Sequence, residues 1–239
     1  MSKKQIIRSL AIWLFGLAIA GNVNAGSINK SITVEAGSES RGDSSVNGSI
    51  TVGPGATVTG SLETVNGAIR IGDSANVEDL QTVNGSIKLG SNVVAGDISG
   101  VNGSIRLGDN STVKGEVSVV NGKISSENGS RISRDVTNVN GEMRIVATQI
   151  GGNLTTVNGD VLLTDASTLS GNLTVEKPSG WGWDKKRVPQ VVIGPGSVVE
   201  GDIRLERKDE LFIHETATVG GVTGVMTLDD AVRFSGNRP

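Results

Sequence analysis

The stretch VNGSIRLGDNSTVKGEVSV, residues 101–119, is one full unit of a repeat that runs through most of this 239-residue chain. Its opening tripeptide, Val-Asn-Gly, occurs seven times, at intervals of 18 or 19 residues. A fixed period of this length is too short for a helical hairpin repeat and suits one coil of a β-helix, in which each turn of chain lies on the turn before. The repeated asparagines are Asn47, Asn66, Asn84, Asn102, Asn121, Asn140 and Asn158.

Within the unit, residues 105–107 and 117–119 alternate apolar and polar side chains with the period of two that is typical of strands, and glycines separate these runs. The pattern predicts an all-β, single-chain parallel β-helix (solenoid) of about ten triangular coils, each with three short strands and 18 to 19 residues. Like residues then stack into a continuous aliphatic core. The stacked pairs are Ile50/Val52, Ile69/Ile71, Ile87/Leu89, Ile105/Leu107, Met143/Ile145 and Val161/Leu163.

The asparagine column has a physical explanation of its own. Asn-Gly is favoured where the backbone adopts positive φ, which predicts a bend at each site. Stacked amides about 4.8 Å apart can also donate to one another along the column. We therefore interpret the seven asparagines as a structural hydrogen-bond ladder rather than as ligand-binding residues.

Residues 1–25 have the pattern of a secretory signal peptide, with Lys3, Lys4 and Arg8 followed by 11 apolar residues and the small-residue site Val23-Asn24-Ala25. Eleven apolar residues fall short of the roughly 20 that span a bilayer. We expect cleavage of this segment and an exported protein, periplasmic or extracellular, that does not span the membrane.

The composition excludes several protein classes. The absence of cysteine excludes a lipoprotein with a lipidated cysteine and a disulfide-stapled domain. Without residues 1–25, 19 basic residues stand against 25 acidic ones, a net charge of −6. Such a chain is not expected to bind nucleic acid.

The repeat also divides the chain. We expect β-helix coils over residues 26–176, an inserted loop over 177–190, final coils over 191–224 and a C-terminal cap over 225–239. Insertions in solenoids often carry binding, so the loop is a candidate partner site, although its two indole rings could equally fold back over the core. Its candidate residues are Trp181, Trp183, Lys185, Lys186 and Arg187.

A second candidate surface lies four residues after the ladder asparagine, where the outward residue is basic in four coils. Three of these coils are consecutive, and such stacking of like charges is unfavourable unless something compensates. Either Asp73 and Asp109 form solvated pairs with the basic residues, or the row faces an anionic glycan or lipid. The basic residues are Arg70, Lys88, Arg106 and Arg144.

Enzymatic functions are disfavoured. Residues 52–58 and 193–198 look like the hexads of left-handed β-helix acyltransferases and γ-class carbonic anhydrases, which need a catalytic histidine or three histidine ligands. This chain has His214 alone, which is most simply an outward strand residue. We expect no catalytic residue, no metal site and no cofactor.

The coils at residues 101–117 and 191–203 resemble the bactofilin, or polymer-forming cytoskeletal, family, and the resemblance covers about residues 30–224. It implies a right-handed triangular β-helix that self-associates end to end. Bactofilins typically lack a cleaved signal, this regular asparagine column and the Trp-Gly-Trp loop. We therefore predict an exported, non-enzymatic scaffold of the bacterial cell envelope that can self-polymerise. The alternative is a module that binds an envelope glycan or anionic lipid through the loop and the basic row.

Overall fold

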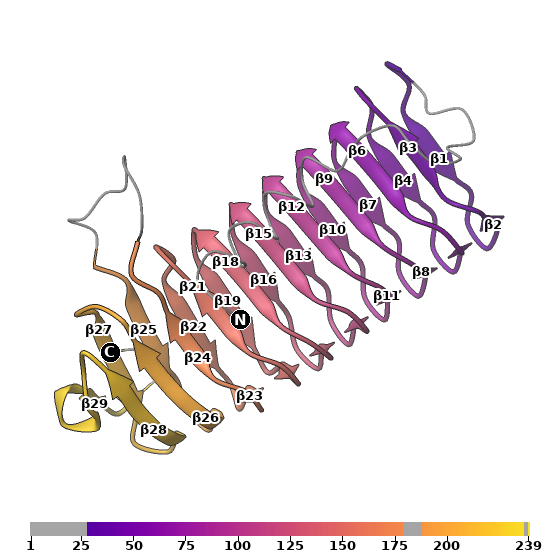
Figure 1. The fold of residues 1–239 in the computed structure, drawn as a ribbon. Helices are drawn as coiled ribbons and strands as arrows, with labels where there is room; N and C mark the ends of the chain where they lie inside the picture. Colours follow the sequence, from indigo (N-terminus) through magenta and orange to yellow (C-terminus); the bar gives the residue numbers. More distant parts are fainter. Residues whose placement is uncertain (1–27, 179–187, 237–238) are drawn as a thin grey trace.

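The computed structural model describes residues 28–178, 188–236 and 239, which form one elongated rod of stacked coils (Figure 1). Within these residues there are 29 β-strands and one 3-10 helix, η1 (Leu228–Asp230). The strands pair in parallel with those of the coil before and the coil after. The predicted all-β, single-chain parallel β-solenoid of about ten coils is confirmed.

Each regular coil contributes three strands, which stack into three columns along the rod. The first column is an 11-stranded sheet. It consists of β1 (Ile32–Val34), β4 (Ile50–Val52), β7 (Ile69–Ile71), β10 (Ile87–Leu89), β13 (Ile105–Leu107), β16 (Ile124–Ser126), β19 (Met143–Val146), β22 (Val161–Thr164), β25 (Gln190–Ile193), β27 (Glu210–His214) and β29 (Val232–Phe234).

The other two columns belong to a second, 18-stranded sheet. The second column consists of β2 (Glu39–Ser40), β5 (Thr57–Val58), β8 (Asn76–Val77), β11 (Val94–Ala95), β14 (Thr112–Val113), β17 (Arg131–Ile132), β20 (Gln149–Ile150) and β23 (Thr168–Leu169). The third consists of β3 (Asp43–Ser45), β6 (Leu62–Asn66), β9 (Leu80–Asn84), β12 (Ile98–Asn102), β15 (Val117–Asn121), β18 (Val136–Asn140), β21 (Leu154–Thr156) and β24 (Leu173–Val175). Two longer strands, β26 (Val198–Leu205) and β28 (Thr218–Gly224), continue both columns.

The core is a stack of aliphatic layers, because the strand register follows the sequence repeat. Ile87 pairs with Ile69 of the coil before and with Ile105 of the coil after. All three side chains are at most 1% exposed. Burying each such side chain stabilises the fold by roughly 1.5 to 3 kcal/mol. A single coil cannot cover both sides of its own layer, so each coil depends on its neighbours.

The glycine after each ladder asparagine is required by the close stacking of backbones. We expected positive φ at these bends, but in this column only Gly103 and Gly141 adopt it. At Gly85, an added Cβ would overlap the carbonyl oxygen of Gly67 in the preceding coil. Glycine is therefore selected here because it has no Cβ, and the expected conformational reason holds at two positions only.

The coil after Asn121 departs from the consensus, since Ser126 and Glu127 replace the usual apolar residue and glycine. β16 nevertheless pairs in register with both neighbouring strands. Ser126 is 1% exposed, and its hydroxyl accepts a hydrogen bond from the Thr148 hydroxyl over 2.9 Å. A buried polar pair replaces an aliphatic contact, and the stack continues.

The insertion between β24 and β25 leaves the stack intact. Val161 of β22 pairs with Val191 of β25, so these partners are 30 residues apart in the sequence rather than 18 or 19. β24, before the insertion, likewise pairs in register with β26, after it, so the coils remain stacked. The additional residues are accommodated between Val175 and Gln190 without a change of register.

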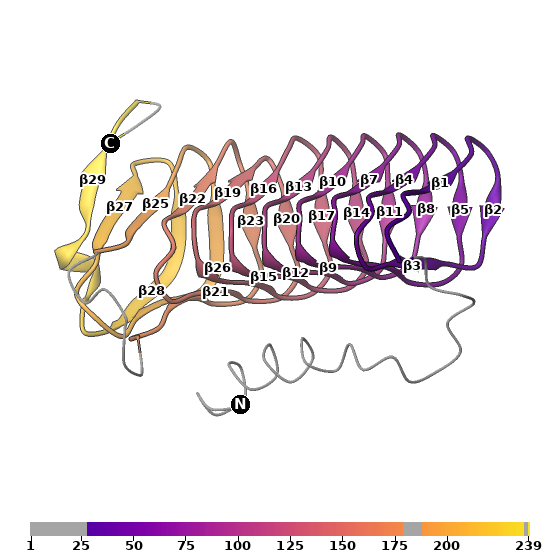
Figure 2. The ribbon, with the colours of Figure 1, turned by 90° about the horizontal axis from the view of Figure 1, so that it is seen from above.

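The C-terminal residues lie over the last coil (Figure 2). β29 pairs with β27, and Met226 is 5% exposed within the hydrophobic core. At the start of η1, the backbone N–H and the hydroxyl of Thr227 both donate to the Asp230 carboxylate, over 2.8 and 3.1 Å. Met226 thus fills the end of the aliphatic stack, and the helix turn holds the chain in place.

Alanine at Gly85 should destabilise the rod by about 3 kcal/mol or more, because its Cβ would meet the backbone of the coil before. Gly100→Ala is the matched control, since its Cβ would find its nearest neighbour, Val119 Cγ2, at an ordinary 3.5 Å. The control should stay within about 1 kcal/mol of the wild type. Thermal unfolding followed by circular dichroism measures both variants. Equal stability of the two variants would contradict this account of the glycine column.

Candidate functional site

The asparagine ladder is present, which confirms the prediction that the repeated amides hydrogen-bond to one another. In each step, Nδ2 of one asparagine donates to Oδ1 of the asparagine one coil before, over 2.7 to 3.3 Å. The ladder begins one coil earlier than predicted, at Asn29. The tripeptide search missed Asn29 because its neighbours are Ile28 and Lys30. Its position 18 residues before Asn47 was the available signal.

Most of the ladder faces solvent. Asn47 through Asn121 are exposed at every step, whereas Asn158 is 8% exposed. An asparagine amide has two N–H donors, and the ladder uses one. The second N–H of Asn102 has no partner among the described residues. The column therefore presents a row of amide donors on the outside of the rod.

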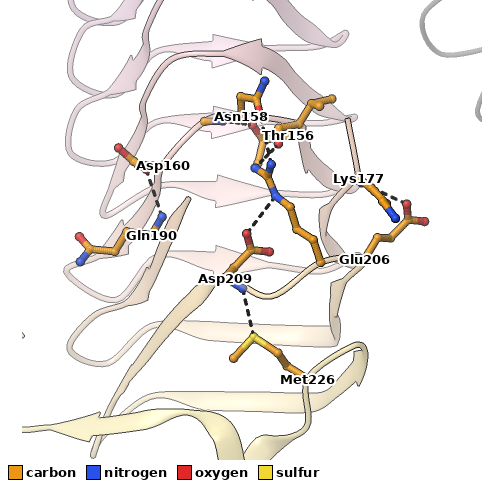
Figure 3. Close-up of polar contacts among 11 residues, drawn as sticks. Thr156, Asn158, Asp160, Lys177, Gln190, Glu206, Asp209 and Met226 are labelled. Atoms are coloured by element: carbon orange, nitrogen blue, oxygen red, sulfur yellow. Dashed lines mark hydrogen bonds and ion pairs between the residues drawn. The ribbon is translucent and has the colours of Figure 1, made fainter. Parts of the chain in front are cut away.

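The ladder ends at Asn158, which is labelled in Figure 3, and Arg207 from two coils further along closes it. Nη1 of Arg207 donates to Oδ1 of Asn158 over 3.1 Å, and Nη2 donates to the Val157 carbonyl over 2.6 Å. Its Nε donates to Asp209 over 3.1 Å. Lys177 occupies the ladder position in the intervening coil, directly before the insertion. Arg207 thus satisfies the last amide oxygen where the repeat is interrupted.

Asp209 is the most unusual carboxylate among the described residues. It is 4% exposed, and its Oδ2 is buried without a hydrogen-bond partner. Its backbone N–H donates to the Met226 sulfur over 3.3 Å. Burial raises the pKa of Asp209 to about 6, although the ion pair and hydrogen bond from Arg207 act in the opposite direction.

The predicted basic residues lie where the strand register puts them. Arg70, Lys88 and Arg106, which we call the basic row, stack directly on β7, β10 and β13 with their side chains exposed. Arg106 forms an ion pair over 2.7 Å with Glu127. Among the described residues, neither Arg70 nor Lys88 forms an ion pair. Arg144 is separated from the row because Ser125 stands between them.

The compensating pairs that we considered do not form. Asp73 Oδ1 accepts a hydrogen bond from the backbone N–H of Ser91 over 2.9 Å, so Asp73 links two successive coils at this corner. Within the described part of the chain, no ion pair joins Asp73 or Asp109 to the basic row. The favourable interaction that would offset the stacked charges is therefore absent at Arg70 and Lys88.

An acidic row runs along another corner of the rod, and the sequence analysis missed it. Its members, Asp79, Asp97, Glu116 and Asp135, directly precede the third-column strands of four consecutive coils. Asp79 Oδ1 accepts the N–H of Asp97 over 2.9 Å, and Asp97 Oδ1 accepts that of Glu116 over 2.8 Å. The signal was an acidic residue at the same 18- or 19-residue spacing, directly after Gly96 in one coil and Gly115 in the next.

Asparagine replaces aspartate further along this corner. Asn153 Oδ1 accepts the N–H of Asn172 over 3.0 Å, and Asn172 Oδ1 accepts that of Asp202 over 2.8 Å. An amide oxygen therefore fills the same structural role as a carboxylate oxygen. The negative charge is not needed for the fold, and its accumulation has a cost. Burial, followed by the charges of Asp97 and Asp135, raises the pKa of Glu116.

The loop residues Trp181, Trp183, Lys185, Lys186 and Arg187 lie outside the described residues.

His214, which we expected as an outward strand residue, ends β27 and is buried. It is 6% exposed, and its ring meets that of Phe234 edge to face at a centroid distance of 5.1 Å. Its Nδ1 lies 2.8 Å from the Thr216 hydroxyl. In the described part of the chain, no three histidine, cysteine or acidic side chains gather in a way that could hold a metal ion. Nor does any helix there have the length and apolar character needed to cross a bilayer.

The chain matches no known family model, no curated protein and no solved structure. The resemblance to the bactofilin family therefore stays a prediction.

Removal of one exposed ladder amide should have a modest effect. Asn102→Ala loses two hydrogen bonds that water can partly replace, so we expect a loss of about 0.5 to 1.5 kcal/mol in the free energy of unfolding. Asn158→Ala should cost more, about 1 to 3 kcal/mol, because it leaves Nη1 of the half-buried Arg207 without its acceptor. Urea unfolding measures both values. No loss at Asn102 would mean that the ladder does not stabilise the rod.

The stability of the rod should fall between about pH 4 and pH 6. The folded protein keeps the proton of Asp209 up to about pH 6, whereas the ordinary pKa of 3.8 applies when the chain is unfolded. The folded state binds more protons in this window, so the free energy of unfolding decreases as pH rises, by up to about 3 kcal/mol. Asp209→Asn should remove this component of the pH dependence. Parallel stability curves for the two proteins would refute the assignment.

Proposed function

We propose that this protein is an exported, non-enzymatic rod that serves as a scaffold of the bacterial cell envelope and joins further copies through its ends. The distribution of exposed apolar side chains carries the proposal. Six large hydrophobic side chains are exposed in the described residues, and five of them lie in the first coil or beyond the last strand of the third column. These five are Ile28, Val46, Val225, Leu228 and Val232, and the sixth, Val188, borders the insertion.

The first coil also offers backbone groups that could extend a sheet. Ile32 donates its N–H to the Ser49 carbonyl over 2.9 Å, and the Val34 carbonyl accepts the N–H of Gly53 over 2.8 Å. Since neighbouring residues of a strand direct their backbone groups to opposite sides, Thr33 directs its N–H and C=O away from β4. Such an edge is a template for pairing with another chain.

Export and the absence of catalysis are parts of the proposal that rest on the sequence. The signal-like residues 1–25 favour export, and a single histidine disfavours the β-helix enzymes considered above. Binding of an envelope glycan or anionic lipid is the second candidate function, favoured by the unpaired cations of the basic row.

Charges placed on the C-terminal end should abolish association. We expect the wild-type protein to form longer rods as its concentration rises, and Leu228→Lys/Val232→Lys to remain short, because the exposed apolar surface of both side chains is lost. Thr33→Pro should act in the same way at the other end, since proline lacks the free N–H and is tolerated on an edge strand. Sedimentation and negative-stain measurements of rod length provide the test.

Val188→Lys is the matched control, because Val188 is 51% exposed but lies at neither end. It should associate like the wild type. A wild-type protein that stays one rod long at every concentration would refute end-to-end association. Equal effects of the control and the end variants would mean that the ends are not the contact.

A further inference from the structure

Two rows of charged side chains run along different sides of this rod with one shared repeat. The basic row lies on the outer face of the first column, and the acidic row lies at the corner before the third column. Both rows carry one charge per coil, and the three coils of the basic row are also coils of the acidic row. Arg70 and Asp79 belong to one coil, Lys88 and Asp97 to the next, and Arg106 and Glu116 to the third.

Within the described part of the chain, Arg106 is the one member of either row that forms an ion pair, with Glu127 over 2.7 Å. Arg70 and Lys88 have no ion-pair partner in the described part of the chain, and no described cation forms an ion pair with Asp79 or Asp97. Arg134 is close enough to favour the charged form of Glu116, but the neighbouring acids outweigh it. Stacked like charges are unfavourable, so each row would gain from an opposite charge. Both rows are present although the acidic charges are not needed for the backbone hydrogen bonds at this corner. Asn153 and Asn172 accept the same hydrogen bonds without a charge.

We propose that the basic row of one molecule binds the acidic row of a second copy that lies alongside it. Successive charges in both rows are separated by the rise of one coil, about 4.8 Å, because the same backbone stack spaces them. When one charge of a row meets its opposite, the next two are therefore in position as well. This lateral contact goes beyond end-to-end association and rests on the proposed function only in taking another copy as partner.

The two rows lie on different sides of the rod, so the contact joins unlike surfaces. After pairing, the first molecule keeps a free acidic row and the second keeps a free basic row. A contact of this kind continues from copy to copy instead of stopping at a dimer. Rods would therefore line up into a sheet or a bundle.

A second copy fits these observations better than an anionic polymer does. A polymer would pair with the basic row but would leave the acidic row unexplained. The chain without residues 1–25 has a net charge of −6, which repels a polyanion at long range. A copy brings both signs at the required spacing.

Two variants, each defective in one row, test the pairing. In the first, Arg70→Glu and Lys88→Glu reverse the two unpaired cations. In the second, Asp79→Asn, Asp97→Asn and Glu116→Gln remove three charges, and the asparagines keep the oxygen that accepts the next backbone N–H, as Asn153 does. Each variant alone should lose side-by-side association at low salt, with an affinity lower by roughly tenfold or more.

A mixture of the two variants gives the decisive result. The first variant retains an acidic row and the second retains a basic row, so the mixture should form lateral pairs that extend no further. Arg131→Gln/Arg204→Gln is the control, since it removes two exposed cations outside the row and should leave lateral association unchanged. Rod width in negative-stain images and sedimentation at low and high salt are the measurements, with circular dichroism to confirm folding.

Several outcomes would overturn the proposal. Wild-type rods that never lie side by side at low salt would do so, and so would a mixture that fails to pair. Loss of association in the first variant but not in the second would refute pairing with the acidic row, because the basic row would then bind another surface of the second copy. Rod length and rod width separate the two proposals. Long single rods would support end-to-end assembly and refute the lateral contact. Short rods in pairs would support the lateral contact and refute end-to-end assembly.

Discussion

The parallel pairing of each coil with the next is the interaction on which the rest of this structure depends. It places residues 18 or 19 positions apart directly above one another, at the spacing of hydrogen-bonded strands, about 4.8 Å. Any residue type that recurs with the repeat therefore becomes a straight row along the rod. The aliphatic core, the amide ladder and both charged rows are consequences of this single geometry. They differ only in how each side chain interacts with the same type of side chain in the next coil.

This difference explains the lengths of the rows. An amide both donates and accepts, so it is complementary to another amide, and the asparagine column runs unbroken through eight residues from Asn29 to Asn158. Aliphatic side chains are equally compatible with their copies, and their layers continue to the end of the rod. Charges repel their copies. The basic row stops at Ser125 after three residues, and the acidic row gives way to Asn153 after four.

Much of the fold could be predicted because the repeat is visible in the sequence. The period of Val-Asn-Gly, the alternation at residues 105–107 and the recurrence of apolar pairs were enough for the coil, its strands and its core. The ladder was predictable for the same reason. We expected glycine in its column because of positive φ, whereas the main reason is the close approach of stacked backbones. That distance depends on two coils, so the local sequence of one coil does not reveal it. The same limit applies to the burial of Ser126 against Thr148.

The contact between Arg207 and Asn158 and the acidic row could not be predicted from the sequence, for different reasons. Arg207 reaches Asn158 across 49 residues, because the insertion interrupts the period and the two become neighbours only in the folded rod. The acidic row follows the period, but it mixes aspartate with glutamate and is continued by asparagine, so a search for one residue type does not find it. In a solenoid, residues that recur with the sequence period form rows on the surface. A partner therefore binds a row of side chains rather than a single residue. For this rod, the spacing of charges along each side is therefore a property from which partners can be inferred.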